Sequence, residues 1–115
     1  MQQETRPWGS FKVLHEEDDY KIKEIIVKPG KRLSYQSHKQ RSEHWFVMNG
    51  IGMVTLGDKQ NSVAPTDSVY ISVLAKHRIE NLGTTDLRFI EVQTGVYFGE
   101  DDIERYEDDF GRVGG

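Results

Sequence analysis

The sequence predicts an all-β fold, either a barrel or a sandwich. Apolar and β-branched residues occur in short runs, and turn-forming residues separate these runs at short, regular intervals. Many short strands with evenly spaced turns are typical of β-barrels and β-sandwiches. The expected strands lie around residues 11–13 and at residues 20–28, 33–38, 43–48, 51–56, 60–63, 69–73, 77–80 and 87–93.

The first half of the chain has the strongest strand and turn signals. The run at residues 20–28 contains four β-branched residues and stops at Pro29 and Gly30. Asn49 and Gly50 are a strong hairpin signal, because both central residues of a type I′ turn need a positive φ angle. We therefore expect the strands on either side of this turn to pair with each other.

Turn signals continue through the second half of the chain. Gly57 and Asp58 close one turn, and residues 65–67 and 81–84 separate the later strands. Only residues 101–107 have a helical pattern, and this segment is short enough to be a loop instead. The sequence therefore predicts an all-β domain with at most one short helix.

The composition indicates one small cytoplasmic domain. The 115 residues have the length of a single domain, which we expect to span residues 1–115. The chain has no cysteine, which excludes disulfides and thiolate metal ligands. No segment approaches the roughly 20 apolar residues of a membrane span, and the N-terminus lacks the pattern of a signal peptide. We therefore expect a cytoplasmic location and no membrane partner.

The net charge of −4 is concentrated near the C-terminus. Residues 99–112 carry seven acidic residues against two arginines, so the remainder of the chain is nearly neutral. An acidic segment of this kind argues against nucleic-acid binding. Apolar side chains in and before this segment predict that it docks on the body of the protein, and they are Tyr97, Phe98, Ile103, Tyr106 and Phe110.

The residues that carry chemistry lie between positions 36 and 77. Gln36 and His38 should point to the same side of a strand, because residues i and i+2 share a face. Residues 39–42 can turn and bring Glu43 back beside them, and His77 opens a later strand. An amide oxygen, two imidazoles and a carboxylate suit zinc, manganese, iron(II), cobalt or nickel. We expect one divalent metal ion at these residues, with zinc as the first choice.

Each of these residues also has an ordinary structural interpretation. A single histidine on a strand is more often a hydrogen-bonded side chain than a ligand, and glutamine and glutamate are mostly surface residues. The joint spacing is more informative, because it matches a known motif. Gly30, Gln36, His38, Glu43 and Gly50 follow the first cupin motif, with Gln36 in place of its first histidine.

The second cupin motif is matched less completely. His77 and Asn81 fit it, whereas Ser72 and Leu74 replace its proline and glycine. The chain thus resembles the cupin superfamily, which implies a double-stranded β-helix, a jelly-roll-like barrel with a metal near its mouth. Further blocks are similar to the type II mannose-6-phosphate isomerase family, at residues 6–10, 27–30, 41–45, 77–81, 99–103 and 107–112.

In that family the cupin is often the C-terminal part of a bifunctional protein with a mannose-1-phosphate guanylyltransferase domain. This sequence contains no such nucleotidyl domain, so no nucleotide transfer is expected. The resemblance implies a metal-dependent isomerase that interconverts mannose 6-phosphate and fructose 6-phosphate. A metal held by Gln36, His38, Glu43 and His77 would then act as a Lewis acid on the sugar carbonyl.

The resemblance leaves the remaining roles open. Arg41 is the first candidate to bind the substrate phosphate, because the loop that joins the ligand strands should lie at the barrel mouth and a guanidinium can hold two oxygens at once. Lys23, His44 and Glu91 are candidates for proton transfer. The alternatives to an isomerase are a non-catalytic module that binds metal and sugar phosphate, or a nucleotide-sugar epimerase or dioxygenase. We also expect a homodimer, because small cupins often pair their sheet edges.

Overall fold

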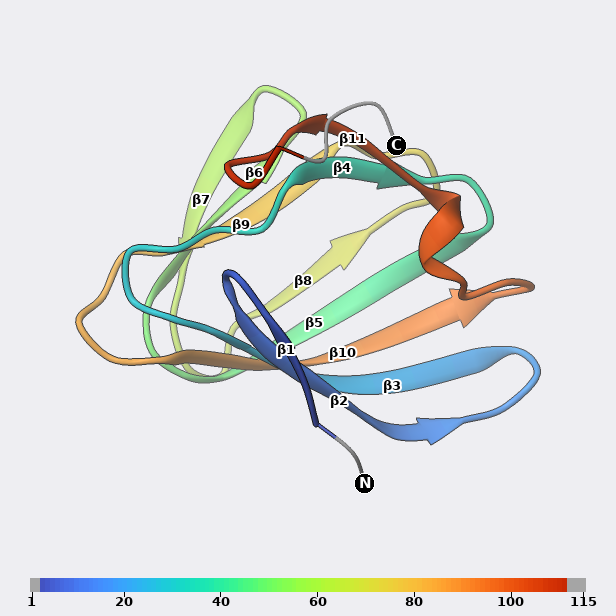
Figure 1. Cartoon of the computed structure of the whole chain (residues 1–115), viewed down its shortest axis with the longest axis horizontal. Coiled ribbons are helices and arrows are strands. Elements are labelled where there is room, and N and C mark those ends of the chain that lie inside the picture. Colours follow the sequence, from blue (N-terminus) through green and yellow to red (C-terminus); the bar gives the residue numbers. More distant parts are fainter. Residues whose placement is uncertain (1–2, 112–115) are drawn as a thin grey trace.

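Two antiparallel sheets face each other in the computed structural model, which describes residues 3–111 (Figure 1). The order of the six-stranded sheet is β1 (Gln3–Arg6), β2 (Gly9–Glu16), β3 (Tyr20–Val27), β10 (Leu87–Gly95), β5 (Arg41–Asn49) and β8 (Ser68–Ile71). The order of the five-stranded sheet is β11 (Ile103–Glu107), β4 (Tyr35–His38), β9 (His77–Asn81), β6 (Gly52–Leu56) and β7 (Lys59–Val63). The all-β prediction is confirmed.

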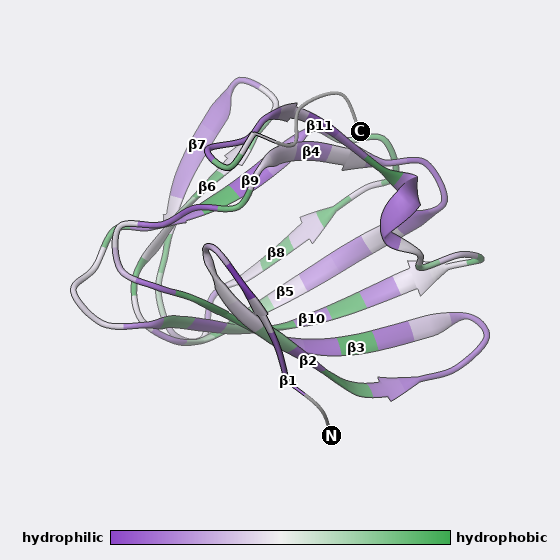
Figure 2. Cartoon of the chain, in the orientation of Figure 1, coloured by the Kyte–Doolittle hydropathy of each residue, from purple (hydrophilic) through white to green (hydrophobic). Residues whose placement is uncertain are grey.

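Side-chain alternation along the strands builds the interior between the two sheets. In β5, Glu43, Trp45 and Val47 are buried, whereas His44 and Phe46 face outward. Figure 2 shows hydrophilic and hydrophobic residues alternating along β3 and β10. The buried apolar side chains form one core cluster, which includes Val27, Trp45, Val47, Val54, Ile71, Ile79, Leu87 and Phe89. A closed interior of this kind can hold a polar site among packed apolar residues.

The expected hairpin at Asn49 and Gly50 is wrong. The strands on either side of it belong to different sheets, because β5 pairs with β10 and β8 while β6 pairs with β7 and β9. Only Gly50 of the two residues has a positive φ angle, and a Cβ atom there would lie 2.6 Å from the Asp86 carbonyl oxygen. The glycine therefore permits a close crossing between sheets.

Residues 101–107, for which the sequence left a short helix or a loop open, are mostly strand. Residues Glu100–Asp102 form one turn of 3₁₀ helix, and residues Ile103–Glu107 form β11, which pairs with β4. The long-range pairing with a free sheet edge overrides the local helical pattern. Phe110 packs against the core cluster, and Arg32 forms an ion pair with Asp109 at 2.9 Å. The expectation that the acidic segment docks on the body is confirmed.

In the described part of the chain, no helix has the length and apolar character that a membrane crossing requires.

Candidate metal centre

His38, Glu43 and His77 meet inside the barrel, although they come from three different strands. His38 ends β4, Glu43 lies in β5 of the opposite sheet, and His77 begins β9. One ligand atom from each lies within 4.8 Å of the other two. The Glu43 carboxylate is 3.6 Å from His38 Nδ1 and 3.9 Å from His77 Nε2. All three side chains are buried, with at most 3% exposed.

The two histidines are held in the neutral form that metal ligands require. Burial is the main cause that lowers the pKa of His38 to about 3 and that of His77 to about 4. His77 Nδ1 is 2.8 Å from the Ala75 carbonyl oxygen, which can only accept a hydrogen bond. Nδ1 therefore carries the proton, and the lone pair of Nε2 lies on the side of Glu43.

His38 contains an unsatisfied polar atom. Its Nε2 is buried and has no hydrogen-bond partner within residues 3–111. A buried nitrogen without a hydrogen-bond partner destabilises the fold, so its presence calls for an explanation such as a bound ion. Two neutral imidazoles and a carboxylate converge here without sulfur, which is a common donor set for divalent transition metals. The residues present therefore fit the metal ion that the sequence predicts.

Gln36 lies in the same pocket and faces His77 across the pairing of β4 with β9. Its side-chain nitrogen donates to the Ser34 hydroxyl at 2.8 Å and to the Ser34 carbonyl at 3.3 Å. These bonds use the amide nitrogen and leave the amide oxygen available as a ligand. The role of Gln36 as a fourth ligand stays a prediction.

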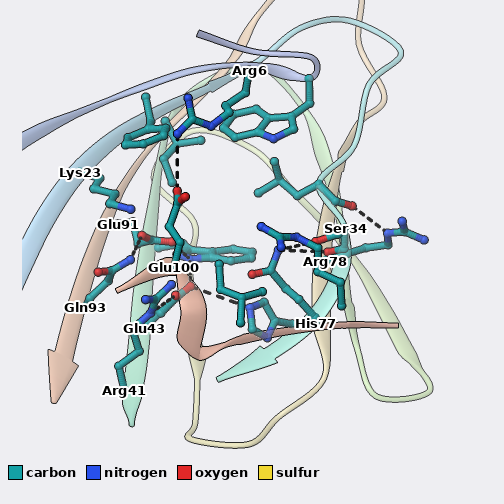
Figure 3. Close-up of a pocket in the computed structure, with 18 residues that line it drawn as sticks. Arg6, Lys23, Ser34, Arg41, Glu43, His77, Arg78, Glu91, Gln93 and Glu100 are labelled. Atoms are coloured by element: carbon teal, nitrogen blue, oxygen red, sulfur yellow. Dashed lines mark hydrogen bonds and ion pairs between the residues drawn. The ribbon is translucent and has the colours of Figure 1, made fainter. Parts of the chain in front are cut away.

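Arg41 and Trp45 hold the Glu43 carboxylate from two sides. The Arg41 Nε donates to Oε2 at 3.1 Å, and the Trp45 Nε1 donates to Oε1 at 3.0 Å (Figure 3). Arg41 also donates to the Phe98 carbonyl at 3.3 Å and is 4% exposed. The sequence places Arg41 in an accessible loop at the barrel mouth, but the structure places it at the buried start of β5. Its phosphate-binding role stays a prediction.

Glu91 is a second buried carboxylate, beside Glu43. Trp45 Nε1 donates to it at 3.1 Å, and the Gln93 amide donates at 2.6 Å. Burial first, and then the nearby Glu43 charge, raise the pKa of Glu91 to about 7. Of the three candidates for proton transfer, Glu91 and Lys23 line the pocket, whereas His44 lies on the outer face of β5.

Glu91 is expected to make the stability of the metal-free protein depend on pH. Its raised pKa means that the folded protein binds a proton that the unfolded chain releases above about pH 4.5. This stabilisation is present below that pH and is lost as the pH rises through about 7. Relative to Glu91→Gln, the wild-type free energy of unfolding should fall by about 3 kcal/mol over this range.

Urea unfolding at several pH values, with chelator present, measures this difference. The comparison with Glu91→Gln is needed because the lowered pKa values of His38 and His77 act in the opposite direction over an overlapping range. Glu16→Gln, at an exposed carboxylate, is the control. Parallel pH profiles for wild type and Glu91→Gln would show that Glu91 is ionised in the folded protein.

The loop that leads to His77 contains a strained residue. Leu74 has a φ angle of 72°, at the position where the cupin motif has glycine. Its backbone N–H donates to the His38 carbonyl at 2.8 Å, so this conformation joins the loop to the end of β4. A left-handed conformation costs a non-glycine residue about 1–2 kcal/mol. The substituted motif therefore keeps a glycine-like backbone.

Leu74→Gly is expected to stabilise the protein by up to about 1 kcal/mol. The substitution relieves the left-handed strain and loses about 0.5–1 kcal/mol through the greater entropy of the unfolded chain. Urea unfolding measures the change. Leu82→Gly is the matched control, because Leu82 is also an exposed loop leucine and has no positive φ angle. Equal destabilisation by both substitutions would show that Leu74 carries no strain.

The pocket beside the three candidate ligand side chains opens between the two sheets and is lined by residues from both of them. Among the polar residues that line it, Arg6, Gln93 and Glu100 received no role from the sequence. Gln93 lies two residues after Glu91 on the inward face of β10, so a second polar residue at an inward position was the available signal.

Comparisons with known proteins identify the family of the chain and agree with its fold. The family model described as mannose-6-phosphate isomerase C-terminal matches residues 1–108. Alginate biosynthesis protein AlgA of Pseudomonas aeruginosa is 48% identical over 108 residues, which are 94% of this chain and 22% of that protein. Mannose-1-phosphate guanylyltransferase 2 of Escherichia coli O157:H7 is 48% identical over 103 residues, which are 90% of this chain and 21% of that protein.

A solved structure supports the architecture. The cupin domain of Schizosaccharomyces pombe Cnp3 superposes with a TM-score of 0.73 at 14% identity, over 75% of this chain and 64% of that one. This likeness identifies the fold as a cupin double-stranded β-helix. The chain spans less than a quarter of the length of the curated relatives named above. On the match of residues 1–108, the chain belongs to the mannose-6-phosphate isomerase C-terminal family.

Proposed function

We propose that this protein is a metal-dependent isomerase that interconverts mannose 6-phosphate and fructose 6-phosphate. The observation that carries the proposal is the buried cluster of His38, Glu43 and His77 beside a pocket with further ionisable side chains. Membership of the isomerase family supports the reaction class. A site of this kind, with a metal donor set and a neighbouring carboxylate, suits proton transfer beside a carbonyl.

The metal would be held by His38, Glu43 and His77, with Gln36 as the fourth ligand. When bound, a divalent ion, with zinc as the first candidate, would supply a Lewis acid that polarises the sugar carbonyl. Arg41 and Trp45 would fix the orientation of the Glu43 carboxylate through their hydrogen bonds. Hydrogen bonds of this kind to a metal-binding side chain commonly alter metal affinity by about 10- to 100-fold.

Isomerisation moves a proton between the two carbon atoms at the carbonyl end of the sugar. Glu91 is the buried carboxylate of the pocket that the ligand cluster does not include. Trp45 and Gln93 each donate one hydrogen bond to it and so fix its direction. We assign Glu91 to take the proton from one carbon and return it to the other. A positioned acid–base group of this kind contributes about 10²- to 10⁴-fold to a rate.

The physiological setting is part of the proposal. One relative is named for alginate biosynthesis, and we propose that the sugar phosphates handled by this chain likewise serve polysaccharide synthesis. The homodimer and the cytoplasmic location that the sequence predicts stay predictions.

A coupled assay tests the reaction directly. Mannose 6-phosphate, supplied to the metal-loaded protein, is expected to yield fructose 6-phosphate. Chelation should stop turnover, and an added divalent ion should restore it, because the ligands survive chelation. Binding of mannose 6-phosphate without turnover, across zinc, manganese, iron(II), cobalt and nickel, would instead make this protein a binding module.

A further inference from the structure

Lys23 is a buried amine that has no direct hydrogen-bond or ion-pair partner among residues 3–111, although the charges of Glu91 and Glu43 act on it through space. It lies in β3, is 7% exposed, and lines the pocket. Its ammonium group lies over the Phe11 ring, 4.5 Å from the centroid. Glu91 lies opposite Lys23 on the neighbouring strand, and its two carboxylate oxygens accept hydrogen bonds from Trp45 and Gln93. A buried charge is destabilising unless an anion compensates it.

Arg6 adds a second cation on the same side of the pocket. Its guanidinium carbon lies 4.9 Å from the centroid of the same Phe11 ring. It forms a short contact with Glu4 at 3.2 Å and a longer one with Glu100 at 3.7 Å. In Figure 3 the Glu100 side chain extends toward Arg6, and Lys23 lies on this side of the pocket, away from His77. The structure thus already holds the Glu100 carboxylate against Arg6, on the side of the pocket where Lys23 lies.

We propose that Lys23 and Arg6 form a subsite for the phosphate group of the substrate, and that Glu100 occupies it when no substrate is bound. The identity of the ligand as a sugar phosphate rests on the proposed function. The subsite itself rests on the two cations and the displaceable carboxylate. A phosphate brings more negative charge than a carboxylate and can accept hydrogen bonds from both cations.

The position of this subsite matches the shape of a hexose 6-phosphate. Lys23 pairs with Glu91, and Glu91 pairs with Trp45, so two strand spacings separate Lys23 from the residue beside Glu43. Two spacings amount to about 10 Å. The reacting carbons of the sugar lie at one end of its carbon chain and the phosphate at the other. A substrate that spans this distance has its carbonyl near the metal ligands and its phosphate near Lys23.

Arg41 is less suited to this task than the sequence suggests. Its guanidinium already donates to Glu43 and to the Phe98 carbonyl, and Glu43 balances its charge. A phosphate at Arg41 would also lie beside the metal ligands, where the sugar carbonyl must bind. Lys23 and Arg6 leave that position free for the carbonyl.

Ligand binding to metal-free protein of residues 1–115 tests the subsite without turnover. Tryptophan fluorescence reports the titration, because Trp8 and Trp45 line the pocket. The wild type should bind mannose 6-phosphate and inorganic phosphate but not mannose. Lys23→Met and Arg6→Gln should each weaken phosphate binding by about 10- to 100-fold, as expected for the loss of a charge-assisted contact. Both variants should keep the wild-type circular dichroism spectrum and take up one metal ion.

Two further variants sharpen the result. Glu100→Gln should strengthen phosphate binding by about twofold to fivefold, because it removes a competing, solvent-exposed carboxylate. Lys12→Met is the matched control, since Lys12 lies on the neighbouring strand and pairs with Glu24 outside the pocket. It should bind phosphate as the wild type does.

Wild-type phosphate binding in both Lys23→Met and Arg6→Gln would overturn the subsite. So would a loss of phosphate binding confined to Arg41→Lys, which would restore Arg41 as the phosphate residue. The isomerase proposal fails separately. If phosphate binding depends on Lys23 and Arg6 but fructose 6-phosphate never forms with any metal tested, the subsite stands and the catalytic proposal does not.

Discussion

Replacing His38 and His77 together by alanine is expected to abolish divalent metal binding. The wild type should hold about one ion per chain, because a carboxylate and two neutral imidazoles converge within 4.8 Å of one another. Removal of two of these three ligands leaves one carboxylate and the Gln36 amide, which is too few to retain a structural or catalytic ion. Elemental analysis after dialysis against the metal measures the effect.

A second pair of histidines in the same chain supplies the control. His15 and His44 are exposed, and neither belongs to the ligand cluster. His15→Ala with His44→Ala removes the same number of imidazoles and should leave the metal content unchanged. If both double variants lose the ion equally, or if neither does, the cluster is not the metal site.

Glu91→Gln is expected to lower the rate of isomerisation by about 10²- to 10⁴-fold while metal content stays at one ion per chain. The amide keeps the shape of the side chain but cannot accept the proton that the reaction moves. The loss should fall on kcat rather than on KM, because the substrate phosphate and the metal ligands are untouched. Steady-state kinetics on metal-loaded protein measures the change.

Glu24→Gln is the matched control for this variant. Glu24 lies on the adjacent strand β3, where its ion pairs with Lys12 and Arg88 are outside the pocket. It should retain wild-type kinetics. Full activity of Glu91→Gln would assign proton transfer to another group. Loss of metal in Glu91→Gln would instead show that Glu91 acts through Trp45 and Glu43, to which it is linked by hydrogen bonds.

Local sequence patterns were sufficient to predict most strands and the ligand cluster. Alternation placed Glu43 and Trp45 on one face of β5, and the motif spacing brought His38 and His77 to the same point. Alternation depends only on short stretches of chain, so a single sequence carries it directly. The meeting of His38 and His77, which lie far apart in the sequence, was predicted through the resemblance to the cupin motifs.

Long-range pairing was the part that local patterns could not supply. β11 forms because β4 offers a free sheet edge, and the crossing at Gly50 depends on its packing against Asp86. Lys23 belongs to a run with ambiguous alternation, and only its pairing with Glu91 directs it into the pocket. The turn expected at residues 39–42 likewise placed Arg41 in a loop at the barrel mouth, whereas the structure places it with Glu43 in one buried strand.

Nuclear magnetic resonance of mannose 6-phosphate, incubated in heavy water with the metal-loaded protein, is the decisive test of the proposed isomerisation. Proton transfer through an exchanging group inside the pocket predicts fructose 6-phosphate that carries deuterium at C1, with deuterium also appearing at C2 of the remaining mannose 6-phosphate. Neither product nor deuterium, in a sample that retains one metal ion per chain, would contradict the assignment of this protein as an isomerase.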